Sequence, residues 1–516
     1  MNNFNSMLLS KRLKLAAIAS LFCIFFVFSQ SKKIEKESNG KLLQVLEYFQ
    51  KKGSKEQYDA AVFLVKNIPI HYSEDNAWLD KNGKTVPFKV TDYKDIEQAE
   101  AAFIELKNMA GMVSKSITIR DSDAVDPQVL IKNIEMAFES WKENPWSKSY
   151  DFKTFCEYIL PYRSLTEPLQ DWRSDYQLTF EKLSAGMADP SDPVELCSNI
   201  MNNIKHFDFE LKRFDPKPLL GPNDLLFWRE GNCPDLANAA LFACRSLGVA
   251  ATFDCTPHYA ASSNRHYWNT VIDNKGRHIP FNGNQDLPYV YNAVNKRLGK
   301  VFRFAFSEQK NNLPSIIAAN EIPEDLLKSR NIIDVTSEYV DVSDISYAFS
   351  PKAASKVSYI SVFNRGNWRV LDWARITDKV SVYKNMGRDI VYLPGVFAAG
   401  KMAFEEYPVL LDKKGASIIL KPDALHSFSA KLSRENEHKN SYTDNNPLQI
   451  VKGEKYRIYV WSGNWRMVDE QAAIDDNNLV FSKLPKNGLF LMCPSKPDFY
   501  ERIFTVNPET SLITWY

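Results

Sequence analysis

The sequence predicts a multidomain α+β protein with a helical N-terminal region, an α+β core and two C-terminal all-β modules. Three observations carry this prediction. The chain has 516 residues, which is too long for a single hydrophobic core. Apolar residues recur at helical spacing through much of its first half. After residue 300, short alternating runs rich in β-branched and aromatic residues replace that pattern.

The composition is that of an ordered globular protein. The chain is 44% hydrophobic and 25% charged, and its net charge is +1. No long basic stretch breaks this balance, so we expect no nucleic acid among the partners.

The N-terminus is expected to direct export. Basic residues within 11–14 precede an uncharged run over 15–29. That run is short for a membrane span, which needs about 20 residues, and it is typical of a signal peptide. We predict a signal peptide over 1–29 that is cleaved before Gln30. A lipid anchor on Cys23 and an uncleaved membrane anchor are the alternatives.

Helical patterns dominate the predicted N-terminal region, residues 30–190, and continue into the core. A polar tether over 30–40 is followed by a helical hairpin, whose two apolar patterns lie on either side of Gly53. Further helices are predicted at Ile96–Ala110, Pro127–Lys142 and Pro193–Lys205.

A charge-rich segment interrupts the helical pattern at Pro161. It contains Arg163 and Glu167, followed by Trp172 and Arg173. One interpretation is a packed helix break with local ion pairs. The other is a charged wall of a cleft, with Arg163 and Glu167 contacting substrate.

The most informative stretch begins at Cys233. Pro234 suits a first helical turn, apolar residues follow at helical spacing, and Gly248 suits the helix end. Cys233 is therefore predicted at a helix N-terminus, where the helix dipole and free N–H groups favour a thiolate and could stabilise an oxyanion. Asp235 is interpreted as a structural first-turn acid.

Three strands are expected next, at Val249–Cys255, His266–Asp273 and Arg277–Gly283. A bulged turn with Gly276 in the left-handed conformation would pair Trp268 with Asn282 and place both on one face with His266. A simple four-residue loop would put Asn282 on the opposite face.

Cys233, His266 and Asn282 could serve as nucleophile, base and orienting amide. A buried thiol with a satisfied histidine is the alternative, and His258 and His278 compete as bases. Neither a metal nor a cofactor is predicted, because no paired Cys or His spacing suits a metal. Six cysteines follow the predicted cleavage point, too sparsely for a disulfide framework.

The β-rich region contains a repeat. Residues 359–370 (YISVFNRGNWRV) recur at 456–467 (YRIYVWSGNWRM). This predicts two tandem β-modules, at 326–430 and 431–516. The shared Gly-Asn-Trp-Arg is interpreted as hairpin structure, with a sugar-binding platform as the alternative.

The succession GNCPDLANAALFACRSLGVAATF, HYWNTVID and IPFNG resembles the transglutaminase-like superfamily. The layout, including YILPYRSLTEPLQDWR, resembles exported transglutaminase-domain proteins of Bacteroidetes-type bacteria, which end in sandwich-like β-modules. The resemblance implies a papain-like core, predicted at 191–325, with Cys233 as nucleophile and His266 as base. Asn282 stands where the family usually has Asp. The periplasm or cell surface of a Gram-negative bacterium is the expected location.

We therefore expect an exported thiol-dependent acyl-transfer enzyme that hydrolyses or transamidates peptide or isopeptide amides. Its substrate would be a peptide, protein or glycopeptide. Trp228 and Trp268 join Arg163 and Glu167 as candidate substrate-binding residues. The alternative is a non-catalytic scaffold whose β-modules bind cell-surface glycan or protein.

Overall fold

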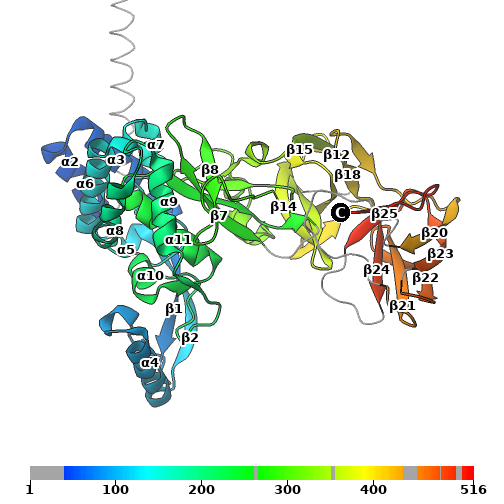
Figure 1. The fold of residues 1–516 in the computed structure, drawn as a ribbon, viewed down its shortest axis with the longest axis horizontal. Helices are drawn as coiled ribbons and strands as arrows, with labels where there is room; N and C mark the ends of the chain where they lie inside the picture. The colour runs from blue at the N-terminus through cyan, green and yellow to red at the C-terminus, as the bar shows by residue number, and fades with distance from the viewer. Residues whose placement is uncertain are drawn as a thin grey trace, which may run out of the picture. The chain divides into compact units, whose positions relative to one another are not determined.

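The computed structural model describes residues 40–260, 265–294, 296–349, 355–433, 450–476, 478–494 and 502–516 (Figure 1). The predicted signal peptide lies outside these residues. Within them, no helix is long and apolar enough to cross a membrane.

The described chain divides into two compact units. The first contains residues up to Ala251 together with Ile272–Arg277, and the second contains Thr252–Val271 and His278–Tyr516. The segment predicted as one core, residues 191–325, is therefore shared between both units.

The first unit is mainly helical, as the apolar spacing predicted. Most of its helices start at a side-chain cap; Ser54, for example, makes a reciprocal capping box with Gln57. Its α-helices are α2 (Gly40–Lys52), α3 (Lys55–Asn67), α4 (Ile96–Ala110), α5 (Asp121–Ala124), α6 (Pro127–Glu143), α7 (Phe152–Tyr158), α8 (Arg173–Phe180), α9 (Pro193–Ile204), α10 (Pro222–Trp228) and α11 (Cys233–Ser246). Two short strands, β3 (Asp208–Phe209) and β4 (Glu230–Gly231), pair in parallel just before α11.

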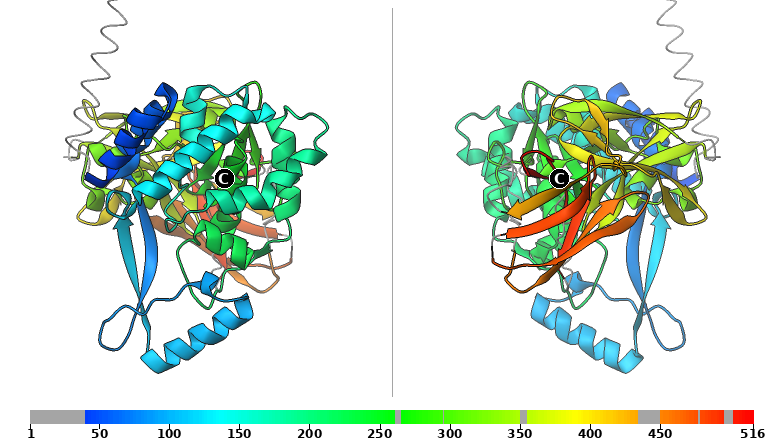
Figure 2. Two further views of the ribbon diagram at one scale, coloured as in Figure 1. Left: turned by 90° about the vertical axis from the view of Figure 1, so that its left-hand side faces the viewer. Right: turned by 90° about the vertical axis from the view of Figure 1, so that its right-hand side faces the viewer.

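An arm made of a β-hairpin and α4 interrupts the predicted helical region. Strands β1 (Tyr72–Leu79) and β2 (Val113–Arg120) pair antiparallel along their whole length. The hairpin and α4 project away from the other helices of this unit (Figure 1 and Figure 2). The predicted helical region 30–190 thus also contains a hairpin that the sequence analysis did not predict, because this pairing joins segments about 40 residues apart and β2 is mostly exposed and polar.

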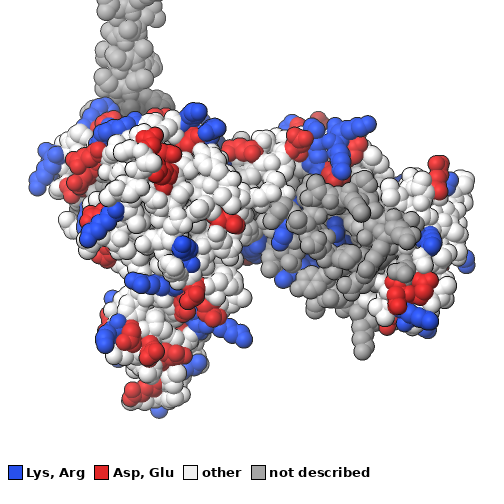
Figure 3. Space-filling view, in the orientation of Figure 1, with Lys and Arg blue, Asp and Glu red and all other residues white. Residues whose placement is uncertain are grey.

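Basic and acidic side chains are interspersed over the described surface seen in Figure 3. This mixture of charges on the face shown agrees with the net charge of +1.

The second unit begins with a five-stranded sheet in the order β11-β10-β5-β7-β8. Its strands are β5 (Ala251–Thr256), β7 (His266–Ile272), β8 (His278–Phe281), β10 (Phe302–Phe304) and β11 (Ile332–Asp334). A separate pair joins β6 (Tyr259–Ala260) to β9 (Arg297–Leu298). Strand β5 is wholly buried, which fits its central place in the order.

The rest of this unit forms two β-modules with matching strand orders. The first has the pair β12-β15 and the path β14-β13-β16-β18-β19, and the second has β20-β23 and β22-β21-β24-β25-β26. The first module's strands are β12 (Val342–Ala348), β13 (Val357–Asn364), β14 (Asn367–Arg375), β15 (Val380–Gly387), β16 (Ile390–Ala398), β17 (Lys401–Phe404), β18 (Val409–Leu411) and β19 (Ser417–Ile419). The second module's are β20 (Ser427–Ser433), β21 (Lys455–Trp461), β22 (Trp465–Ala472), β23 (Asn478–Pro485), β24 (Phe490–Pro494), β25 (Ile503–Val506) and β26 (Ile513–Trp515). The predicted boundary at 430/431 falls inside β20.

The repeated sequence forms a hairpin in each module, with a two-residue loop between Asn364 and Asn367 in the first and a three-residue loop between Trp461 and Trp465 in the second, and it joins the two modules. Phe363 and Trp368 face each other across β13 and β14, as Trp461 and Trp465 do across β21 and β22. Phe363 also contacts Trp465, with ring centroids 5.8 Å apart, and Trp368 contacts Trp461 at 5.5 Å. These rings belong to a hydrophobic core shared by both modules, which supports the structural interpretation of the repeat.

Candidate active site

Cys233 lies where the sequence predicted, at the first residue of α11. Asn232 caps the helix, accepting a hydrogen bond from the backbone of Asp235, and the Asp235 carboxylate accepts one from the Asn232 backbone in return. Asp235 is fully buried and also forms an ion pair with Arg213 at 2.6 Å. Its structural role is confirmed, and it holds the helix start that carries the thiol.

The far end of α11 is fixed by the segment after α6. The carbonyls of Ser246, Leu247 and Gly248, at and just after the helix end, accept hydrogen bonds from the side chains of Ser140 in α6 and of Asn144, Trp146 and Ser147 after it. These bonds supply partners for carbonyls that have none within the helix. Gly248 has φ +77°, and a Cβ there would lie 2.6 Å from the Ser140 carbonyl oxygen. The predicted helix end thus requires glycine at position 248, both for its left-handed backbone conformation and because a side chain would clash there.

Cys233 is exposed, whereas Cys156, Cys197, Cys244 and Cys255 are buried. The expectation of a lowered thiol pKa was wrong. Desolvation by neighbouring atoms raises the pKa of Cys233, a hydrogen bond from its own backbone lowers it by less, and the Asp235 charge raises it further. The helix start therefore does not generate a resting thiolate on its own.

His266 is the first residue of β7 and is half-buried among aromatic rings. Its ring centroid lies 5.8 Å from Trp268, 6.3 Å from Tyr291 and 6.4 Å from Tyr259. Burial lowers the pKa of His266 to about 4, and the Lys296 charge adds to this shift. The imidazole is therefore neutral near pH 7, in the form that can accept a proton.

The lowered pKa of His266 should make folding stability depend on pH. An unfolded histidine takes up a proton below about pH 6.5, whereas the folded one resists until about pH 4. The unfolded state binds more protons in this window, so the free energy of unfolding should fall by roughly 1–3 kcal/mol as the pH drops through it. Denaturant titrations of the native chain and of His266→Gln between pH 4.5 and 6.5 measure this change. The free energy of unfolding should depend less steeply on pH in the variant. Equal slopes would contradict the burial argument.

The hairpin after His266 has the predicted bulged turn. Gly276 has φ +75°, its N–H donates to the Asp273 carbonyl at 3.0 Å, and the Asp273 N–H donates to the Arg277 carbonyl at 3.0 Å. This geometry sets the register that we expected to bring Asn282 toward His266.

The expected contact between Asn282 and His266 does not form. Strand β8 ends at Phe281, and the chain then turns, so that Asn282 pairs with Asp286. The Asn282 amide donates to the Gln285 side chain at 2.8 Å. Within the described residues, no hydrogen bond links Asn282 to His266, so the amide is committed to its own turn.

Trp268 is fully buried and does not offer a substrate contact, which corrects its assignment as a binding residue. Its indole N–H donates to the Tyr339 hydroxyl at 2.9 Å, and that hydroxyl donates to Asp254 at 2.6 Å. Asp254 in turn accepts both arms of Arg303, at 2.8 and 2.7 Å. This network fixes the indole beside His266. No local pattern predicts it, because Tyr339 and Arg303 are distant in sequence.

The two competing histidines are each held by a carboxylate. His258 lies 3.1 Å from Glu324, and His278 lies 3.7 Å from Glu338. His266 has no such neighbour among the described residues, and it is the histidine surrounded by aromatic rings.

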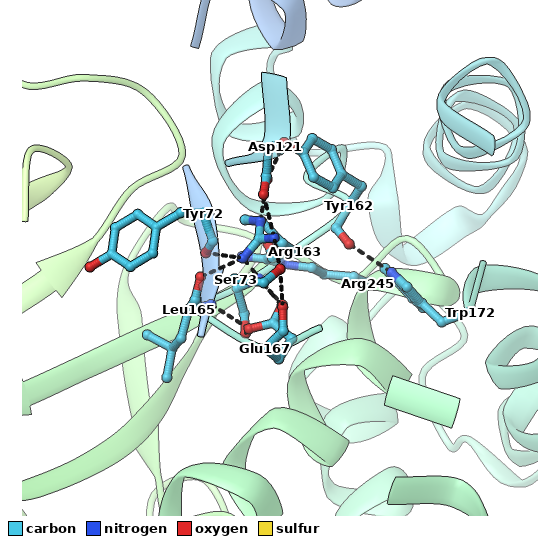
Figure 4. A network of polar contacts seen from close by, with 10 residues as sticks. Tyr72, Ser73, Asp121, Tyr162, Arg163, Leu165, Glu167, Trp172 and Arg245 are labelled. Atoms are coloured by element: carbon cyan, nitrogen blue, oxygen red, sulfur yellow. Dashed lines mark hydrogen bonds and ion pairs between the residues drawn. The ribbon is translucent and has the colours of Figure 1, made fainter. Parts of the chain in front are cut away.

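Arg163 and Glu167 form a buried structural network, so their assignment to a cleft wall was wrong (Figure 4). Each is 1% exposed. The Arg163 guanidinium binds both oxygens of Asp121, at 2.5 and 2.7 Å. Glu167 accepts the backbone N–H groups of Ser164 and Leu165 at 2.7 and 2.8 Å. Their polar atoms are used inside the fold, as the packed-break interpretation expected.

The same segment is tied to α11. Arg245, near the end of that helix, donates to the Arg163 carbonyl at 2.8 Å, and Ser164 hydrogen-bonds Asn238 in its middle. Arg173 donates to the Arg245 carbonyl at 2.8 Å. The charge-rich segment thus positions the helix that carries Cys233.

Trp228 is 5% exposed and stacks on Phe214, with ring centroids 4.9 Å apart. It also lines a cavity of about 520 Å³ in the first unit. Its role in substrate binding stays a prediction. Among the described residues, no group of three or more His, Cys, Asp or Glu side chains could hold a metal ion.

The fold and these residues define a class: a papain-like α+β domain with an exposed cysteine opening a helix and a histidine opening a later strand. Residues 181–283 match the family model described as the transglutaminase-like superfamily, so this part of the chain is a transglutaminase-like domain. The match includes Cys233, His266 and Asn282.

Among solved structures, the crystal structure of red sea bream transglutaminase is similar over 86% of this chain and 77% of its own, with 10% identity and a TM-score of 0.17. No curated protein sequence is significantly similar to this chain.

Proposed function

We propose that this protein is a thiol-dependent acyl-transfer enzyme with Cys233 as nucleophile and His266 as general base. The observation that carries the proposal is the exposed cysteine at the start of α11, inside a segment that matches the transglutaminase-like superfamily. Both functional residues fall within the matched segment.

The pKa shifts favour a neutral thiol and a neutral imidazole in the resting protein. The pKa of the Cys233 thiol is raised and that of the His266 imidazole is lowered. The proton therefore has to move to His266 while the sulfur attacks, not before. In the proposed reaction, the sulfur bonds to an amide carbonyl carbon while His266 takes the thiol proton. The imidazolium then gives that proton to the leaving nitrogen as the C–N bond breaks, leaving a thioester.

Water or an amine resolves the thioester. His266 takes a proton from this second nucleophile, its oxygen or nitrogen bonds to the carbonyl carbon, and the C–S bond breaks to restore the thiol. We favour hydrolysis or transamidation of peptide or isopeptide amides in a peptide, protein or glycopeptide. The basic and apolar pattern of residues 11–29 supports export, and we propose the periplasm or cell surface as the place of action.

Labelling with iodoacetamide tests the assigned nucleophile. At pH 7 and pH 9, with mass spectrometry of the peptides, Cys233 should react first among the cysteines in the described part of the chain because it is the exposed one. Its rate should rise from pH 7 to pH 9, because the raised pKa leaves little thiolate at neutral pH.

His266→Gln should slow labelling of Cys233 at pH 7 if His266 takes the thiol proton. The matched control is His258→Gln, whose imidazole is paired with Glu324. Labelling of the half-buried Cys493 at the same rate as Cys233, with no effect of His266→Gln, would count against the proposal.

A non-catalytic scaffold is the second candidate, favoured by the commitment of the Asn282 amide to Gln285 rather than to His266. An imidazole without an orienting partner is a weaker base catalyst. In that case the β-modules would bind glycan or protein, and Cys233 substitution would leave every measured activity unchanged.

A further inference from the structure

The cavity beside Trp228 is built by three segments of the first unit that are distant in sequence. The arm contributes Asp75 and Phe88, the charge-rich segment contributes its residues 168–171, and the lead into α10 contributes residues 215–228. Its volume of about 520 Å³ is large enough for an amino-acid side chain and part of its backbone.

Two carboxyl groups in this cavity lack a cationic partner. Asp215 and Asp224 are 2% and 7% exposed. Of the nearby cations, Lys217 pairs with Asp75 at 3.6 Å and Arg213 pairs with Asp235 at 2.6 Å. Lys89 also lines the cavity, where its side chain is exposed. Among the described residues, no basic side chain forms an ion pair with Asp215 or Asp224.

Burial has the expected effect on these two groups. Desolvation raises the pKa of Asp215 and of Asp224; the Asp75 charge adds to the shift of Asp215, and the Asp215 charge adds to that of Asp224. Lys217 opposes this shift without forming an ion pair with either. Asp215 accepts the indole N–H of Trp78 at 2.9 Å, and Asp224 accepts hydrogen bonds from Gln170 and the Gly221 backbone. These donors are neutral, so a bound cation would supply the charge partner that a buried carboxylate normally has.

The side-chain oxygen of Asn223 is a third acceptor in the cavity. The Asn223 backbone N–H donates to Gln170 at 2.7 Å, and its side-chain amide donates to the Asp171 carbonyl at 3.1 Å. Its side-chain oxygen is buried and has no hydrogen-bond partner among the described residues. The cavity thus combines two carboxyls, a free amide oxygen and aromatic walls from Trp228 and Phe88.

We propose that this cavity binds a guanidinium group on an aliphatic stem, as carried by an arginine side chain of a peptide. A guanidinium has five N–H donors in a planar fork, which suits several converging acceptors, and it packs favourably on aromatic rings. A metal ion does not suit the cavity, because no three acidic side chains in the described part of the chain are close enough to hold one. The inference does not rest on the thiol chemistry proposed for Cys233.

Calorimetric titration of the full chain tests this directly. N-acetyl-arginine amide should bind at least about tenfold more tightly than N-acetyl-citrulline amide, which has the same shape without the charge. Asp224→Asn and Asp215→Asn should each weaken the arginine compound by about tenfold or more, since each removes a charged acceptor. Glu56→Gln is the control, because that carboxylate is not part of the cavity wall, is about half exposed and is already paired with Lys142.

Thermal melting of each variant establishes that it is folded before binding is compared. Equal affinity for the arginine and citrulline compounds would overturn the proposal without any variant. Binding that Asp224→Asn and Asp215→Asn leave unchanged would also overturn it. Butylguanidinium distinguishes the source of the group: if it binds and the arginine amide does not, the assignment to a peptide side chain is wrong.

Discussion

Replacing Cys233 by alanine should lower kcat/KM for release of a chromogenic amine from a small acyl reporter by about 10³-fold or more. The side chain supplies the bond to the carbonyl carbon, and nothing else at the start of α11 can do so. Asn232 and Asp235 are committed to the capping box, and Asp235 is also paired with Arg213. The helix itself should persist, because its cap does not involve the sulfur.

Cys493→Ala is the matched control, since this half-buried cysteine lies in β24 of the second β-module. It should retain native kinetics. Circular dichroism and melting curves should be the same for Cys233→Ala and the native chain. Activity that survives in Cys233→Ala would remove the nucleophile from the proposal and favour the scaffold.

Replacing Asp121 by asparagine should lower the free energy of unfolding by about 3–5 kcal/mol. The Asp121 and Arg163 side chains are 0% and 1% exposed and meet through two hydrogen bonds. The variant leaves Arg163 buried without its counter-charge and weakens the hydrogen bond from Tyr162, now 2.7 Å long. Equilibrium denaturation in urea, followed by fluorescence, measures the change.

Glu56→Gln is the control for that experiment. Glu56 pairs with Lys142 at 2.9 Å, but both side chains are about half exposed. Exposed pairs of this kind contribute about 0–1 kcal/mol. If both substitutions cost the same, the buried network has no special role in holding the first unit together.

Features encoded by local sequence were predicted well. The helix from Cys233, its proline in the first turn and its end before Gly248 all follow from neighbouring residues, and the structure has them. The turn at Gly276 was predicted for the same reason, because a left-handed residue after a type I turn favours glycine.

Features that depend on distant partners were not predictable from the sequence. Nothing near Arg163 indicates that its partner is Asp121, 42 residues earlier, so the packed-break interpretation expected local ion pairs instead. The β1–β2 pairing is non-local in the same way, and the polar character of β2 hides it.

The candidate site was predicted in part. The sequence located Cys233 and His266 but could not give the desolvation that raises the thiol pKa and lowers that of the imidazole. The pairing of Asp273 with Arg277 at the turn was predicted, yet Asn282 lies one residue beyond the end of β8, where it pairs with Asp286. Because β8 ends at Phe281, before the predicted strand end at Gly283, Asn282 lies in the turn and not on the strand.

The contacts between the β-modules are reciprocal, as in a two-fold dimer: Phe363, the cross-strand partner of Trp368, contacts Trp465, and Trp461, the cross-strand partner of Trp465, contacts Trp368. In a true homodimer, one substitution would alter both halves of such an interface at once. Here the two β-modules lie on one chain with separate sequences, so a substitution in one module leaves the other unchanged. The repeat shows such a difference, because Asn364 of the first module stands where the second has Trp461, and the two faces of the junction can therefore change separately.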